Sequence, residues 1–268
     1  MITTFLRQFM LGALCALLFV LGGCNQNDML QKLASPSEQT LAKRYIDLLR
    51  QQHFDDVEKA ADASFADAGL HSRLAAMAGF VPAGEPKSIT LVGAHRLLMD
   101  DATTVNTTYE YEFADRLLLF NIALKSKGDK TTIVGFNMVP QHQSLTEQNK
   151  FTLDGKAPML YAVLALTVLL PLFTLFVLVL CIRTPLKGRK WPWVLFVIVG
   201  FGNLSVNWTS GDWSFLPVAA QFFSASAFAP PYGPWMLGVS LPLGALMFLL
   251  LRGKLRAGSD RITSNQKS

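Results

Sequence analysis

The sequence predicts an exported α+β domain, with helices followed by a four-stranded antiparallel sheet, and then an α-helical membrane domain of three spans. Charged residues make up 16% of the 268 residues, against about 25% in an ordinary soluble domain. Residues 25–156 carry 14 Lys/Arg and 17 Asp/Glu, whereas residues 157–268 carry 9 and 2. The first part contains apolar residues at helical and then at strand spacing, and the second contains long uncharged runs. The positive net charge therefore arises in the apolar part, and we expect no nucleic-acid partner.

The N-terminus has the pattern of an export signal. Arg7 is followed by a mostly apolar, uncharged run over 9–23, which ends in Leu21-Gly22-Gly23-Cys24. A short apolar run that ends in small residues is typical of a secretory signal. The tetrapeptide resembles the lipobox of bacterial lipoproteins, which implies that residues 1–23 are cleaved and that Cys24 carries the lipid. An uncleaved signal anchor is the alternative.

A tether over 24–34 is expected to lead into the α+β domain, residues 35–150. Ser35, Pro36 and Glu38 predict the start of a helix, because Ser can cap, Pro suits the first turn and Glu stands at the capping-box position. The apolar spacing predicts helices from 35 to about 52, at 55–58 and at 68–79.

Four strands follow in the predicted domain. Alternation of apolar and polar residues predicts them over 88–98, 104–113, 116–126 and 130–139, joined by short connections. This order of elements over 38–140 resembles the nuclear-transport-factor-two-like, or cystatin-like, α+β cone. The resemblance implies a curved sheet that wraps a helix and often leaves a pocket, and that fold serves enzymes and binding modules alike.

Few residues of the domain suggest chemistry. His95 lies on a predicted strand and could face a pocket, and Glu110 and Glu112 share a strand face, as an acid–base pair would. A surface or core histidine and a wetted strand face explain the same residues without catalysis. No metal or cofactor signature is recognisable, so we expect neither, and the sequence leaves enzymatic activity open while favouring a protein that is not an enzyme.

Three spans are expected in the second part, at 157–182, 191–211 and 234–251, with 213–232 as an outer interfacial segment and 252–268 as a basic cytoplasmic tail. This arrangement places the basic loops inside, as the positive-inside rule requires. Asn203 and Asn207 lie four residues apart in the second span. They are a candidate intramembrane contact, or simply hydrogen bonds between helices.

The sequence therefore predicts a multi-pass lipoprotein of the bacterial inner membrane, with its main domain in the periplasm and its C-terminus in the cytoplasm. The expected partners are the lipid bilayer and a membrane or envelope protein. The domain would bind or sense, as an accessory subunit of a membrane complex. An envelope enzyme using His95 or the Glu110 and Glu112 pair is the alternative, and a small transport component is a third.

Overall fold

The computed structural model describes residues 26–99, 101–186 and 188–256. The chain divides into two compact units, Met1–Glu147 and Gln148–Ser268, and each is described by itself. The predicted signal and Cys24 lie outside the described residues.

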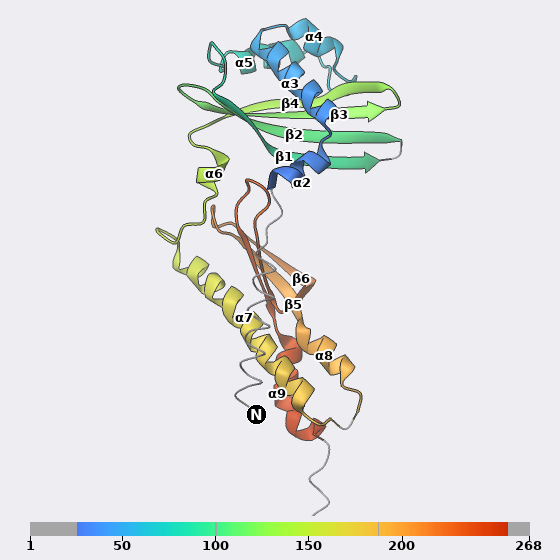
Figure 1. Cartoon of the computed structure of the whole chain (residues 1–268), viewed down its shortest axis with the longest axis vertical. Helices are drawn as coiled ribbons and strands as arrows, with labels where there is room; N and C mark the ends of the chain where they lie inside the picture. The colour runs from blue at the N-terminus through green and yellow to red at the C-terminus, as the bar shows by residue number, and fades with distance from the viewer. Residues whose placement is uncertain (1–25, 100, 187, 257–268) are drawn as a thin grey trace, which may run out of the picture. The chain divides into compact units, whose positions relative to one another are not determined.

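The described part of the first unit begins with helices, and α3, α4 and α5 lie on one side of its sheet (Figure 1). The helices are α2 (Gln26–Leu33), α3 (Pro36–Arg50), α4 (Phe54–Lys59) and α5 (Leu70–Ala78). The predicted start of α3 is confirmed. The amide of Glu38 donates to Ser35 Oγ, the amide of Ser35 donates to the Glu38 carboxylate at 2.7 Å, and Pro36 stands in the first turn.

The segment expected to be a tether contains α2 and is attached to the rest of the unit. Leu30 is buried. Arg96 of the sheet donates from Nε to the carbonyl of Leu33 at 3.0 Å and forms an ion pair of 2.5 Å with Glu38. One arginine therefore fastens the end of α2 and the start of α3 to the same strand.

The sheet of the first unit has the predicted meander order β1-β2-β3-β4, with every neighbouring pair antiparallel. Its strands are β1 (Ser88–Met99), β2 (Ala102–Glu112), β3 (Leu117–Lys127) and β4 (Lys130–Gln141). β-Bulges interrupt the register between Leu91 and Gly93 and between Ala123 and Leu124. Bulges bend a strand and increase its twist, so they curve this sheet.

The core of the first unit lies between this sheet and the helices. Alternate residues of β2, including Tyr109 and Tyr111, are buried beside Ile46 and Leu49 of α3. Burial raises the pKa of the Tyr109 phenol to about 12. Burial, together with the nearby Asp47 carboxylate, also raises the pKa of Tyr111. Both phenols therefore stay neutral. The alternation of apolar and polar residues in β2 thus predicts correctly which side chains enter the core.

The second unit corrects the predicted fold class, because it does not consist of three helical spans. After α6 (Leu145–Gln148), the elements are α7 (Pro158–Arg183), α8 (Trp191–Ile198), β5 (Val199–Asn207), β6 (Trp213–Phe222), β7 (Ala225–Phe228), β8 (Met236–Leu241) and α9 (Leu243–Leu255). The four strands form a second antiparallel sheet in the order β6-β5-β8-β7. Within the described ranges, α7 alone is long and apolar enough to cross a membrane, judged by length and composition, with a mean hydropathy of 2.9.

Glycine and proline explain why the other two predicted spans are not continuous helices. Gly200 and Gly202 each weaken a helix by about 1 kcal/mol relative to alanine, and Gly202 has a φ of +70°. Pro242 prevents Leu241 from taking a helical conformation and stands just before α9. The second predicted span is therefore α8 followed by β5, and the third is β8 followed by α9. The predicted interfacial segment, 213–232, contains β6 and β7.

These mixed segments pack along α7 inside the second unit. Near the start of α7, Leu160 and Val163 form a core with Val206 and Trp208, and near its end Cys181 packs in a second core with Phe248 of α9. The second unit therefore has two apolar clusters along α7, one near each end of that helix.

Aromatic residues mark the end at which α7 begins. Trp208 stacks on Phe151 with ring centroids 4.9 Å apart and donates from Nε1 to the carbonyl of Thr152. Basic residues mark the end at which α7 finishes, where Lys190 donates to the carbonyl of Ile182 and Arg252 donates to Thr184 Oγ1. Aromatic residues are not confined to the first end, because Trp193 packs with Phe248 near the end of α7.

Strand β6 is one of the two edge strands of the second sheet, opposite β7. Its large apolar residues point out on both faces and are more than half exposed, with Trp213 at 63%, Phe215 at 58%, Leu216 at 58%, Val218 at 100% and Phe222 at 74%. In the ladder that the structure describes, β6 pairs with β5 along one edge, with a register shift that leaves residues 217–219 unpaired, and with no strand along the other edge. A strand that is apolar on both faces is ordinarily buried on both faces.

Candidate functional site

The structure does not bring the predicted pocket residues together. His95 of β1 is exposed and stands opposite Asn106, whereas Glu110 of β2 stands opposite Thr90. Four residues along an extended strand correspond to about 13 Å, so His95 and Glu110 belong to different parts of the sheet.

The two predicted carboxylates have structural partners. Glu110 accepts a hydrogen bond of 2.7 Å from the amide of Leu145, where α6 begins. Glu112 accepts one of 3.0 Å from Ser88 Oγ across the β1–β2 ladder. Each carboxylate therefore accepts a hydrogen bond from a nearby residue, and this geometry offers no support for an acid–base pair.

A hollow of about 510 Å³ lies at the ends of β2, β3 and β4. Its charged lining includes Glu112 and Arg116, and the Arg116 guanidinium already pairs with Asp115 at 2.9 Å. The hollow thus lacks an excess of one charge that would select a ligand.

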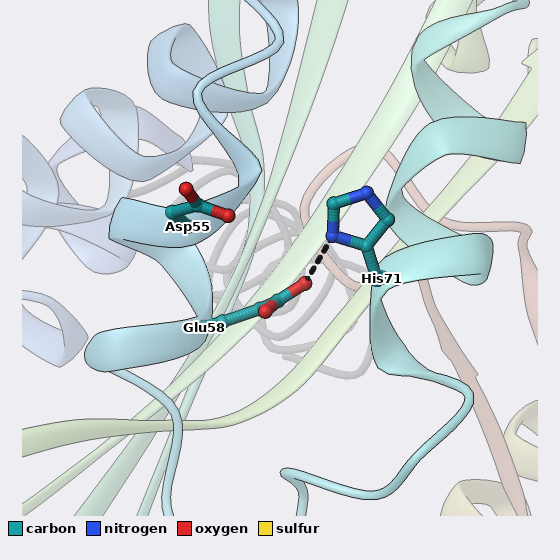
Figure 2. A group of neighbouring side chains, drawn as sticks. All are labelled: Asp55, Glu58 and His71. Carbon is teal, nitrogen blue, oxygen red and sulfur yellow. Dashed lines mark hydrogen bonds and ion pairs between the residues drawn. The ribbon is translucent and has the colours of Figure 1, made fainter.

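A mixed group of side chains does converge in the first unit (Figure 2). Asp55 and Glu58 lie three residues apart on α4, a spacing that puts them on one face of a helix, and His71 faces them from the first turn of α5. Each residue offers one ligand atom, and these atoms all lie within 4.8 Å of one another. The arrangement is that of a candidate metal centre.

His71 is held in place by two contacts. Its Nδ1 lies 2.8 Å from Glu58 Oε1, and the ring of Phe54 meets the imidazole edge-on, with centroids 5.4 Å apart and planes at 83°. The His71 side chain is 61% exposed and that of Glu58 is 33% exposed. The group is therefore accessible from solvent while its imidazole is oriented by neighbours.

The other charges of α4 and α5 have their own partners. Lys59 lies 3.3 Å from Asp56, and Arg73 lies 2.9 Å from Asp67. The hydrogen bond from Arg73, followed by that from the amide of Gly69, lowers the pKa of the Asp67 carboxyl. In the described part of the chain, no basic side chain neutralises Asp55.

The sequence prediction missed this group because its ligand atoms come from two helices. Glu58 and His71 are 13 residues apart, and that separation matches no recognised metal motif. The pairing of α4 with α5 in space is the information that the linear pattern lacked.

Asn203 and Asn207 lie on β5 of the second unit rather than on a helix face. Asn203 accepts a hydrogen bond from Ser205 and lines an apolar groove of about 570 Å³ between α7 and the sheet. Asn207 accepts hydrogen bonds from the amides of Thr209 and Ser210 and so stabilises the turn before β6. The two amides do not form one contact, and Asn207 has a structural role.

Comparison with known proteins adds no relative to this picture. No family model matches the chain, and no curated protein or solved structure is similar to it. The function is therefore argued from the geometry of the two units.

Proposed function

We propose that this protein is a membrane-anchored envelope protein of bacteria, whose first unit is a periplasmic binding module and whose second unit joins a protein partner in the membrane. The apolar helix α7, with aromatic residues beside its start and basic residues at its end, supports this orientation. An acylated Cys24 would give the first unit a second attachment to the same surface.

The observation that carries the proposal is the edge strand β6. Phe215 and Leu216 are neighbours on opposite faces of the strand, and both are more than half exposed. In water such a strand is a site of association. An exposed apolar strand of this kind needs either lipid or a protein partner against it. The chemistry of the strand indicates which of the two fits.

A bilayer covers the apolar side chains of β6 but not its backbone. Lipid tails offer no partners to the N–H and C=O groups along the free edge, and each unsatisfied group costs several kcal/mol in hydrocarbon. Pro217 lacks an N–H, which relieves one position of the strand. The remaining groups favour a protein partner, which can supply both apolar contacts and hydrogen bonds.

The enzyme alternative has less support. Glu110 and Glu112 are engaged by Leu145 and Ser88, and His95 lies apart from Glu110. On the polar face of the first sheet, Asn121 Nδ2 donates to Asn106 at 2.7 Å and to Thr108 at 2.8 Å. These neutral side chains supply no general acid or base.

The test replaces one residue of β6 in the full chain. Val218 is fully exposed, so Val218→Asp leaves the packing of the unit unchanged while placing a charge in the proposed interface. We expect the protein, extracted in mild detergent, to run in native gels as a complex larger than its detergent-bound monomer. Val218→Asp should abolish that complex and Val218→Ala should keep it. An unchanged complex in Val218→Asp, or a wild-type chain that runs alone, would contradict the partner proposal.

The lipid anchor has its own test. The intact mass of the mature chain should correspond to an acylated N-terminus at Cys24, and Cys24→Ser should retain the first 23 residues without added acyl mass. A wild-type chain that begins at Met1 and lacks acyl groups would refute the lipoprotein part of the proposal and leave the β6 interface standing.

A further inference from the structure

We propose that Asp55, Glu58 and His71 form a binding site for a divalent transition-metal cation, for which Zn²⁺ is the probe. The site belongs to the first unit alone and does not rest on the proposed membrane function. It is built by the facing ends of α4 and α5 (Figure 2).

The three ligand atoms must move slightly before they can coordinate one ion. Ligands about 2.0–2.1 Å from a tetrahedral Zn²⁺ lie roughly 3.3 Å from each other. The Glu58 and His71 ligand atoms are 2.8 Å apart, and the whole group lies within 4.8 Å. Coordination therefore requires the exposed Asp55 carboxylate to approach the other two ligand atoms, and the hydrogen bond between Glu58 and His71 to open so that both atoms can face the ion.

The charge balance favours a divalent cation. Two carboxylates and a neutral imidazole carry a charge of about −2, which a divalent ion neutralises. Lys59 and Arg73, the basic side chains of the two helices, are paired with Asp56 and Asp67. The Asp55 carboxylate has no ion-pair or hydrogen-bond partner among the residues described.

The ligand types indicate the class of metal. Imidazole nitrogen suits zinc, copper, iron and nickel, whereas magnesium and calcium prefer all-oxygen sites. Three protein ligands leave a fourth position on a tetrahedral ion, and Asp55 and His71 are exposed to solvent. A water molecule, or a side chain from a bound partner, can complete the coordination.

The experiment measures Zn²⁺ binding by equilibrium dialysis to the untagged full chain in detergent. We expect one ion per chain, retained in the presence of a hundredfold excess of Mg²⁺. His71→Ala should weaken binding at least tenfold, because it removes the nitrogen ligand. Asp55→Asn should weaken it by a similar factor, and since Asp55 is exposed and makes no other contact, this variant retains the fold, which circular dichroism checks.

Two matched histidines serve as controls. His95 and His142 lie on the same unit but outside the group, so His95→Ala and His142→Ala should bind Zn²⁺ as the wild type does. The proposal is overturned if the wild type binds no Zn²⁺ saturably, if Mg²⁺ displaces it, or if His71→Ala and Asp55→Asn bind with wild-type affinity.

Discussion

The described residues form two four-stranded antiparallel sheets, and these differ in how far their apolar residues are buried. In the first unit, Phe120 of β3 is completely buried between sheet and helices, whereas Phe222 of β6 in the second unit is 74% exposed. The first sheet is covered on its apolar face by helices of its own unit. The second has α7 along part of it and leaves β6 uncovered on both faces. The apolar face of the first sheet is therefore covered within its own unit, whereas strand β6 of the second sheet requires an environment or a partner.

The largest expected effect on stability is the difference between two phenylalanine replacements, one in each sheet. Phe120→Ala should lower the free energy of unfolding of the first unit by about 3–5 kcal/mol, because it leaves a cavity in the core. Phe222→Ala should change the stability of the second unit by less than about 0.5 kcal/mol, as surface substitutions usually do. Denaturant titration of each variant in detergent measures both. Equal losses at the two positions would mean that β6 is packed in the isolated chain.

A glycine pair tests whether the second unit is closely packed away from β6. A Cβ on Gly244 would lie 1.8 Å from the carbonyl oxygen of Phe196, so α8 and α9 touch at this point. Gly244→Ala should therefore destabilise the unit by about 1–3 kcal/mol or more.

Gly253 is the matched control on α9, since nothing lies within 4 Å of a Cβ placed there. Gly253→Ala should stabilise the helix by up to about 1 kcal/mol. Thermal unfolding compares the two variants. If Gly244→Ala melts at the wild-type temperature, α8 and α9 are not in close contact at Gly244.

A smaller, pH-dependent effect is expected at the start of α3. Burial raises the pKa of the Glu38 carboxyl, but the hydrogen bonds from Ser35 and the pairing with Arg96 outweigh it, so the net pKa lies below 4.5. A lowered folded-state pKa stabilises the protein above the unfolded value, and this stabilisation is lost as the pH falls through the folded value.

Glu38→Gln should accordingly cost about 1–2 kcal/mol at pH 7 and progressively less below pH 4.5. Unfolding titrations of wild type and variant at pH 7 and pH 3 measure the difference. Glu85→Gln is the control, because Glu85 is 88% exposed in its pair with Arg50 and surface pairs contribute little. A Glu38→Gln penalty that stays constant with pH would contradict the ionic role of Glu38.

The sequence predicted the first unit better than the second for a physical reason. Alternation in β2 and the Ser35–Glu38 capping box are local signals, and the structure contains both elements. A long uncharged run specifies burial or a membrane but not helix against strand. That missing information lay in Gly200, Gly202 and Pro242. The prediction instead relied on the length of the uncharged runs.

The candidate metal group could not be predicted because it depends on tertiary packing. His71 meets Glu58 only where α5 lies against α4. By contrast, Glu110 and Glu112 were predicted to share a strand face and His95 to face a pocket, yet the sheet register places His95 away from Glu110, and both carboxylates accept hydrogen bonds.

The most direct test of the account is site-specific photo-crosslinking in native membranes from two exposed apolar positions of the second unit. Val218 of β6 is 100% exposed and Leu250 of α9 is 83% exposed. A photoreactive residue at 218 should yield an adduct with one defined protein, whereas the same residue at 250 should yield lipid adducts. Lipid adducts at both positions would contradict the claim that a protein partner completes the second sheet.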